Sequence, residues 1–243
     1  MADGIYVALS GAIAQAANLE ATAANLANAG TDGYQRVRPV FREELARAGA
    51  NEPAMHYSSL VQTQIDTTRG TTRATGRPLD FALPEGSYLA VSNTAGERYT
   101  RAASLSVSAD GSLRTAHGDA VLAEDGKAIK LSGETGGARV DSSGQLWQGD
   151  ELRCRLKIVG FSTPSALTHE SGALLAPTPA AGTPSPASGP LEVGVVEESN
   201  ANVVGSMTEL VDASRTFEAF QRVIDAFRDA DRAAATTLPN VSP

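Results

Sequence analysis

The sequence predicts an α+β fold, in which N- and C-terminal helices pair as a coiled coil and an all-β domain, a hairpin-rich barrel or sandwich, is inserted between them. Three observations support this prediction. Residues 4–28 and 200–235 carry apolar side chains at helical spacing. Residues 79–176 alternate short apolar runs with turn signals, which is typical of β-hairpins. The chain has 243 residues, of which 42% are hydrophobic, enough for one sizeable domain with appendages.

The first helix is expected within residues 1–35. Its apolar positions alternate intervals of four and three residues, which is the heptad seam of a coiled coil. This seam consists of Ile5, Leu9, Ala12, Ala16, Leu19, Ala23 and Leu26. A second stripe, Gly11, Asn18 and Asn25, runs beside the seam at seven-residue spacing. Its asparagines either fix the register of the helix pair from a buried position or belong to a solvated face.

The stretch NLANAGTDGY, residues 25–34, ends this helix. Asn28 and Gly30 are both suited to a left-handed C-terminal cap. The sequence from Thr31 to Gly33 suits a tight turn. We therefore expect the chain to change direction here.

The middle of the chain is expected to form an extended connector, residues 36–78, followed by the β domain, residues 79–199. Asp-Gly turn signals such as Asp110-Gly111 and Asp125-Gly126 separate runs of five to eight residues in this domain. The tract at 177–190 is rich in proline, alanine and serine. It predicts an extended loop, poorly ordered unless it is covered.

The second helix is expected at 200–235, followed by a tail at 236–243. Val203, Leu210, Phe217 and Ile224 repeat every seven residues, and Met207, Phe220 and Phe227 widen this apolar stripe. Residues 206–209 fit a capping box that would start the helix, and Asn202 is an alternative N-cap one turn earlier.

Several classes of function find no support in the sequence. The net charge of −8 argues against a nucleic-acid binder. We expect no metal or cofactor site and no small-molecule substrate, because no catalytic or phosphate-binding motif occurs. The one cysteine, Cys154, is expected as a buried side chain in a strand. The three histidines, His56, His117 and His169, are expected to be exposed in loops.

The N-terminal segment is not expected to be a cleaved signal peptide or a membrane anchor. It is apolar enough for a signal-peptide core, but its first basic residue is Arg36, so the positively charged n-region is missing. No stretch of about 20 apolar residues exists, so we expect no membrane insertion.

Both ends resemble the signatures of the bacterial flagellar axial proteins, the rod and hook family. The matching residues of the N-terminal signature are Asn25, Leu26, Ala27, Asn28, Thr31, Gly33 and Tyr34. Ala24 and Gln35 depart from that pattern, since an asparagine is frequent at the first position and a basic residue follows the aromatic one. The matching residues of the C-terminal signature are Glu198, Ser199, Asn200, Asn202, Met207, Leu210, Arg215, Phe217 and Glu218. The segment from Arg77 to Leu113 is similar to the β domain of the rod proteins, with Glu85–Leu89 as a looser match.

The resemblance implies a non-enzymatic subunit of the periplasmic rod of the flagellar basal body. In this family the terminal helices form the inner coiled-coil layer of a helical tube that transmits torque, and the β domain faces outward. The implied partners are copies of the chain, other rod proteins and the flagellar export apparatus, which exports such subunits without cleaving a signal peptide. Chain length and the start of the sequence favour the proximal rod over the distal rod. A secreted β-domain adhesin and a peptidoglycan-active enzyme are the alternatives from other classes.

The assembly residues that follow from the seams and the signatures lie at both ends of the chain. We expect the polar side chains of residues 25–34 to pack between subunits. The full set is Ile5, Leu9, Leu19, Asn25, Leu26, Asn28, Gly33, Tyr34, Asn200, Asn202, Met207, Leu210, Arg215, Phe217, Glu218 and Ile224.

Overall fold

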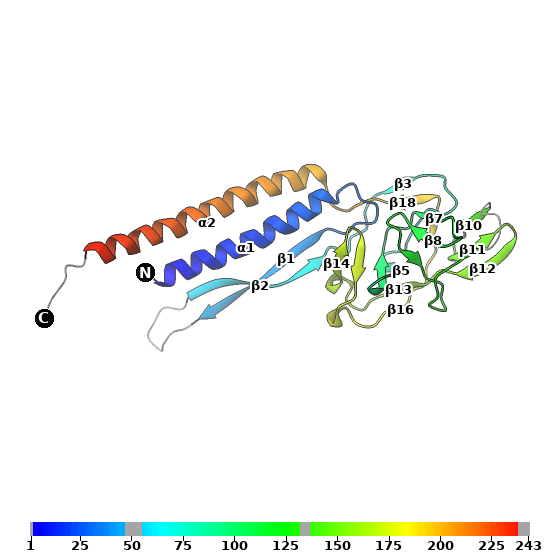
Figure 1. The fold of residues 1–243 in the computed structure, drawn as a ribbon, viewed down its shortest axis with the longest axis horizontal. Coiled ribbons are helices and arrows are strands. Elements are labelled where there is room, and N and C mark those ends of the chain that lie inside the picture. The colour runs from blue at the N-terminus through cyan, green and yellow to red at the C-terminus, as the bar shows by residue number, and fades with distance from the viewer. Residues whose placement is uncertain (1, 47–54, 132–136, 238–243) are drawn as a thin grey trace. The chain divides into compact units, whose positions relative to one another are not determined.

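The computed structural model describes residues 2–46, 55–131 and 137–237. Helix α1 (Ala2–Ala27) and helix α2 (Val203–Thr237) lie side by side, and the strands come between them in chain order, which confirms the α+β class (Figure 1). The chain forms two compact units. The helical unit comprises Met1–Ala24, Arg38–Thr63 and Val203–Pro243, and the β unit comprises Asn25–Val37 and Gln64–Asn202. No helix within the described ranges has the length and apolar character needed to span a membrane.

In the helical unit, α1 and α2 pair in antiparallel directions. A Cβ atom built on Gly4 would lie 2.7 Å from Cζ of Phe227, and one built on Gly11 would lie 2.6 Å from Cζ of Phe220. The residue numbers of the contacts thus increase along α1 while they decrease along α2. The two glycines leave the room that the two phenylalanine rings occupy.

A two-stranded sheet, β1 (Val37–Ala46) and β2 (Met55–Ile65), also contributes to the helical unit. These strands fall within residues 36–78, which the sequence predicts as an extended connector without indicating a pairing partner. The segments around Phe41 and Tyr57 contain β-branched and aromatic residues, which favour a paired strand. The pairing joins residues on either side of 47–54, so it depends on a contact that local sequence does not reveal.

The β unit contains short strands arranged in open sheets. The first strands along the chain are β3 (Thr72–Ala74), β4 (Phe81–Ala82), β5 (Ser87–Asn93), β6 (Gly96–Thr100), β7 (Leu105–Val107), β8 (Leu113–Thr115), β9 (Ala120–Val121) and β10 (Ala138–Val140). They are followed by β11 (Gln145–Gln148), β12 (Glu151–Arg155), β13 (Ile158–Gly160), β14 (Thr168–Ser171), β15 (Leu174–Ala176), β16 (Ser185–Pro186), β17 (Glu192–Val193) and β18 (Val195–Glu197).

The largest sheet has the order β14-β15-β6-β5-β9-β8-β7, and β13 pairs with both β5 and β16. Its described strands do not close into a barrel, so the barrel alternative is not realised. A second sheet has the order β10-β11-β12, and the pairs β17-β4 and β18-β3 bring the chain back toward its C-terminal helix. Most neighbouring strands are joined as antiparallel hairpins, as the turn signals predict.

The core of the β unit is apolar and fully buried. Its main cluster includes Leu89, Val91, Leu113 and Leu146, which come from β5, β8 and β11. Cys154 on β12 is half-buried and packs against this cluster. Burial raises the pKa of its thiol. The side chain lies in a strand, as expected, but it is half-buried rather than buried.

The Pro/Ala/Ser tract at 177–190 is mostly exposed and is attached to the rest of the β unit at a few points. Ala181 is completely buried, and the Thr178 hydroxyl donates a hydrogen bond of 2.6 Å to the Ala166 carbonyl. Farther along the tract, β16 pairs with β13. The covering surface named in the prediction is therefore absent for most of the tract, which is held by these contacts instead.

The ends of the helices decide between the capping alternatives. Helix α2 begins at Val203, so Asn202 occupies the N-cap position and Ser206 lies inside the helix. Helix α1 ends at Ala27, and left-handed φ values among the described residues belong to glycines, of which Gly33 is the first at +71°. The predicted left-handed cap at Asn28 or Gly30 is therefore wrong, and successive turns carry the chain to Gly33 instead.

Candidate assembly site

The seam between the helices follows the predicted heptad spacing but lies one residue away on α1. Gly4 and Gly11 make the contacts with α2. The same alternation of three and four residues continues through Ala8, Gln15, Asn18 and Thr22, none of which is exposed. The predicted position Leu9 is 46% exposed, whereas Ile5, Leu19 and Leu26 are half-buried.

The reason for this shift is the shape of the two helices. Helix α1 is rich in alanine, so several of its faces are apolar enough to form a seam. The rings of Phe220 and Phe227 need a groove without side chains, and Gly4 and Gly11 supply it. Steric fit, rather than apolar character, thus selects the face.

On α2 the contacting face carries three of the four residues that the heptad pattern predicts, whereas the fourth, Val203, is 44% exposed. Leu210, Phe217 and Ile224 are half-buried, and they share their face with Phe220, Phe227 and the buried Ala213. Asn202, Met207, Arg215 and Glu218 are exposed. These four matches to the C-terminal signature therefore lie outside the intramolecular seam.

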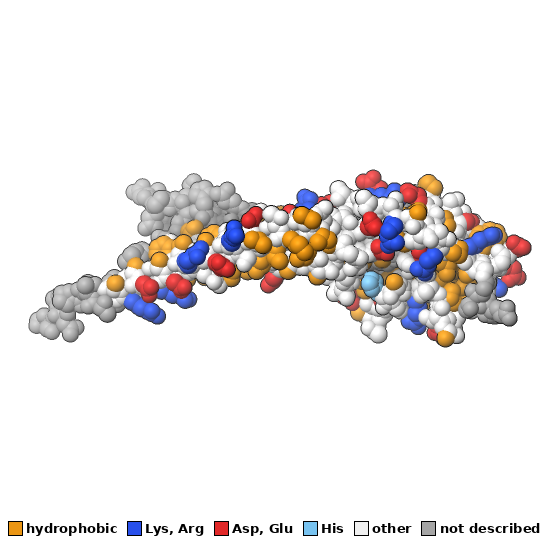
Figure 2. Space-filling view, turned by 90° about the horizontal axis from the view of Figure 1, so that it is seen from above, with side chains coloured by type: hydrophobic (Ala, Val, Ile, Leu, Met, Phe, Trp, Pro, Cys, Tyr) orange, Lys and Arg blue, Asp and Glu red, His pale blue; other side chains and the backbone are white. Residues whose placement is uncertain are grey.

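Large apolar side chains remain exposed on both helices (Figure 2). On α1 they are Tyr6, Val7, Leu9 and Ile13; on α2 they are Val203, Val204, Met207, Val211 and Val223. Monomeric proteins seldom expose such grouped apolar surface without an interaction partner. We call these nine side chains the exposed apolar residues of the helical unit.

In the β unit, the Asn25 side chain fastens the start of β1. Its Oδ1 accepts hydrogen bonds from the Val37 N–H at 2.7 Å and from the Tyr34 hydroxyl at 3.2 Å. Its Nδ2 donates to the Val37 carbonyl at 2.8 Å. The side-chain amide thus makes the two backbone hydrogen bonds with Val37 that a neighbouring strand would otherwise make. Asn25 is 4% exposed, so it is not presented for packing between subunits, contrary to the expectation for this turn.

Asn200 performs a similar task at the other end of the chain. Its Oδ1 accepts a hydrogen bond of 2.6 Å from the Arg36 N–H. Its Nδ2 donates to the carbonyls of Asp66 and Thr68, at 2.9 and 2.8 Å. One side chain therefore holds the segment after the first turn and the segment after β2 together.

Gly33 and Tyr34 also belong to this site. We call the contacts of Asn25, Gly33, Tyr34 and Asn200 within the β unit the joint. The left-handed Gly33 lies so close to the chain at Arg101–Ala102 that a Cβ atom would overlap the backbone. Tyr34 is buried among Ala102, Ala173 and Ala201, and burial raises its pKa to about 12. Its hydroxyl therefore stays protonated and donates to Asn25. Asn28 is half-buried, and its Oδ1 accepts a bond of 3.4 Å from the Thr31 hydroxyl.

The expectation that all three histidines are exposed is wrong for His169. Its ring stacks on Tyr34, with ring centroids 4.6 Å apart. Its Nδ1 lies 2.9 Å from the Gly172 carbonyl and its Nε2 lies 2.7 Å from the Gln35 carbonyl. Burial lowers the pKa of His169, although the two carbonyls oppose this shift. His117 is exposed, as expected, and the side chain of His56 lies outside the described side chains.

Sequence reasoning did not identify a buried ion pair, Arg101 with Glu197. Both side chains are 2% exposed. Nε of Arg101 lies 3.0 Å from Oε1 of Glu197, and its Nη2 donates to Oε2. The available signal was a charged residue in a segment after Tyr99 that carries no other charge up to Leu105. The partner is 96 residues away, so the sequence alone did not indicate it.

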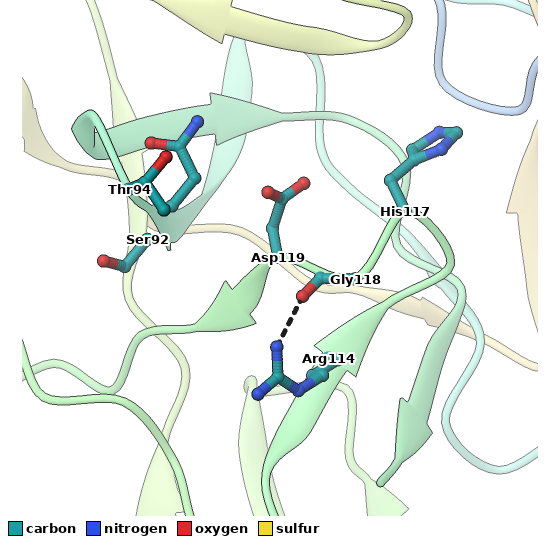
Figure 3. A pocket seen from close by; sticks show the side chains of 7 residues that line it. Ser92, Thr94, Arg114, His117, Gly118 and Asp119 are labelled. Atoms are coloured by element: carbon teal, nitrogen blue, oxygen red, sulfur yellow. Dashed lines mark hydrogen bonds between the residues drawn. The ribbon is translucent and has the colours of Figure 1, made fainter.

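A polar hollow of about 480 Å³ opens beside the turns that follow β5 and β8 (Figure 3). It is lined by Ser92, Asn93, Thr94, Arg114, His117, Gly118 and Asp119. Arg114 donates a bond of 2.8 Å to the Gly118 carbonyl, whereas His117 points away from Ser92 and Asp119. Within the described residues, no group of three or more His, Cys, Asp and Glu side chains could hold a metal ion.

Two protein-family models match the two ends of the chain, the same segments that contribute the residues described above. The family model of the flagella basal body rod protein matches residues 5–35. The model of the C-terminal part of the flagellar basal body rod FlgEFG proteins matches residues 192–237. Both matched segments run from a helix into the joint formed around Asn25 and Asn200.

Relatives extend this similarity over nearly the whole chain. The flagellar basal-body rod protein FlgF of Escherichia coli (strain K12) is 34% identical over 242 residues, covering 94% of this chain and 95% of the relative. FlgF of Mesorhizobium japonicum is 31% identical over 222 residues, covering 90% of each chain. The flagellar basal-body rod protein FlgG of Bacillus subtilis (strain 168) is 27% identical over 254 residues, covering 92% and 94%.

The paired terminal helices, the inserted β unit and these matches define a structural protein of the bacterial flagellum. The chain belongs to the flagellar basal-body rod protein family, and it is a FlgF-like structural subunit of the rod.

Proposed function

We propose that this chain is a non-enzymatic subunit of the proximal rod, which polymerises through its terminal helices into the drive shaft that transmits torque. The observation that carries this proposal is the set of exposed apolar residues on α1 and α2. A subunit that acted alone would gain stability by burying them or replacing them with polar residues.

The geometry of α1 supports a contact with another subunit. Tyr6, Leu9 and Ile13 lie roughly 140–180° around the helix from Gly4 and Gly11, at about 100° per residue. The helix therefore presents one apolar side to α2 and a second one to solvent. Burying the exposed half of three large side chains contributes roughly 2–4 kcal/mol per contact.

Such a contact produces a shaft when it is heterologous. A face on α1 that binds a different face on the next copy does not close on itself, and repetition generates an open helical assembly. Rod proteins of the same family, with related helices, can continue the same stack. The proposed partners are therefore copies of this chain and other rod proteins.

The proximal position is supported by similarity to several proteins named FlgF, at 26–34% identity. A position in the distal rod is the alternative, supported by relatives named FlgG at 27–28% identity. Mass spectrometry of extracted basal bodies distinguishes them. A few copies per basal body support the proximal rod, whereas a several-fold higher number supports the distal rod.

We further propose that the subunit reaches the periplasmic rod through the flagellar export apparatus without cleavage. The mass of the protein extracted from basal bodies tests this, because it should include the N-terminal residues through Ile5. A mass that lacks the first 15–30 residues would instead indicate a cleaved signal peptide.

The assembly proposal is tested with Ile13→Ser, since Ile13 is 57% exposed and its loss should not disturb the fold. We expect the isolated variant to unfold like the wild type but to fail to restore swimming to a strain lacking the gene. The matched control is Glu20→Ser, which changes an exposed polar residue on the same helix and should restore swimming. Normal motility of the deletion strain itself would contradict the rod function and favour the adhesin alternative.

A further inference from the structure

Arg101 is one of the largest side chains that the described part of the chain buries completely. All of its hydrogen-bond donors are directed at acceptors. Its Nη1 donates to the carbonyls of Pro84 and Ser87, at 3.1 and 2.7 Å, and its Nη2 donates to the Leu83 carbonyl at 3.3 Å. These carbonyls satisfy donors but do not neutralise the charge. The carboxylate that neutralises it is that of Glu197.

Glu197 meets two further segments of the chain. Its backbone carbonyl accepts a hydrogen bond of 2.7 Å from the Gly33 N–H. Its Oε1 accepts a bond of 3.3 Å from the Gly70 N–H. The residue therefore joins the turn after α1, the segment before β3 and the bend after β6, three parts of the chain that are far apart in sequence.

We propose that Arg101 and Glu197 act as a folding latch, which makes completion of the β unit depend on docking of residues 195–202. Before that segment docks, the site around Arg101 holds a buried cation without a counter-ion, which is strongly unfavourable. Docking supplies the carboxylate and brings Gly33 and Gly70 into place at the same time. A chain made from its N-terminus onward cannot complete this unit until its C-terminal part is present.

The latch has a consequence for local opening. In an ordinary protein, a short segment near a chain end opens separately from the core, at a lower free energy. Here, opening of residues 195–202 would leave Arg101 held by backbone carbonyls of the β unit without its counter-ion, so it should occur only together with opening of the β unit. The amide hydrogens of Gly33 and Glu198 should then exchange as slowly as those of the core residue Leu113.

Four full-length variants test the latch. Glu197→Gln keeps the shape but removes the charge, and it should raise the unfolding equilibrium constant roughly 100- to 1,000-fold. Glu198→Gln is the matched control, since Glu198 is partly exposed and pairs at the surface with Arg73, and it should leave the constant within about threefold. Arg101→Met should also raise the constant, but by less than Glu197→Gln, because Nε of Arg69 lies 4.0 Å from Oε2 of Glu197 and remains beside the carboxylate. The double variant Arg101→Met/Glu197→Leu removes both charges and should regain at least about tenfold relative to either single variant.

Amide exchange of the double variant distinguishes a latch from a pair that only adds stability. We expect the Gly33 and Glu198 amides to exchange faster than that of Leu113, because their segment can now open by itself. If Glu197→Gln does not fold, the double variant still decides the question, since it must fold if the unpaired charge is the obstacle. A double variant as unstable as the single ones, or one whose Gly33 and Glu198 amides remain as protected as Leu113, would overturn the proposal.

Discussion

Replacement of Asn25 by alanine tests whether the N-terminal signature acts within the subunit. The side chain makes three buried hydrogen bonds, two with the backbone of Val37 and one with the Tyr34 hydroxyl. Each contributes about 1 kcal/mol, and the alanine leaves all three partners without replacement. We therefore expect the free energy of unfolding to fall by about 3 kcal/mol, with a range of roughly 2–4 kcal/mol.

The assay is urea unfolding of the purified full-length subunit, at a concentration where it is monomeric. With a urea dependence of about 3 kcal/mol per molar for a chain of this size, the midpoint should fall by about 1 M. Tyr34→Phe removes one of the three bonds and should cost about 1 kcal/mol, so it calibrates the scale. An Asn25→Ala variant with a wild-type midpoint that nevertheless blocks rod assembly would refute the reasoning. It would show that Asn25 acts between subunits.

Three further outcomes follow from the structure. Gly33→Ala should cost at least about 2 kcal/mol in urea unfolding, because of its left-handed φ and the backbone beside it, whereas Gly30→Ala, with open space around it, should cost under about 0.5 kcal/mol. Phe220→Ala should lower the thermal stability of the helices, followed by circular dichroism, by about 1–2 kcal/mol, whereas alanine at the exposed Met207 should change it by less than about 0.5 kcal/mol. His169 has a pKa below its unfolded value of 6.5, so the unfolded chain binds its proton more readily. Stability should therefore decrease as the pH falls from about 6.5 toward the lowered pKa, and His169→Gln should abolish this part of the pH dependence.

The elements of this fold differ in how far the sequence determines them. Helices α1 and α2 are predicted well, because their apolar residues repeat over several turns and neither helix contains a proline. The hairpins of the β unit are predicted as a class, since Asp-Gly turns are local signals. The pairing of β1 with β2 is not, because it depends on contacts that no local signal encodes.

The joint in the β unit shows the same limit at the level of single residues. The signatures point to Asn25 and Asn200, but an asparagine in a polar stretch reads equally well as a cap, a turn or a surface contact. Its actual partners are backbone groups at Val37, Arg36 and Asp66, which the fold brings near. Backbone partners have no sequence identity, so no pattern of residue types could have revealed them.

The two segments that match the family models acquire a physical meaning from these contacts. Residues 5–35 contain both the α1 face that packs on α2 and the turn that Asn25 and Gly33 fasten. Residues 192–237 contain both Glu197, which reaches Arg101, and the α2 face that receives α1. Each matched segment therefore has to satisfy two folded units at once. A substitution that is compatible with the helix but disturbs the joint destabilises the β unit. A substitution that is compatible with the joint but disturbs the helix face destabilises the pairing of α1 with α2. This double requirement explains why the two signatures contain both apolar seam positions, such as Leu210 and Phe217, and a buried polar side chain, Asn25, which neither a coiled coil nor a β domain would require by itself.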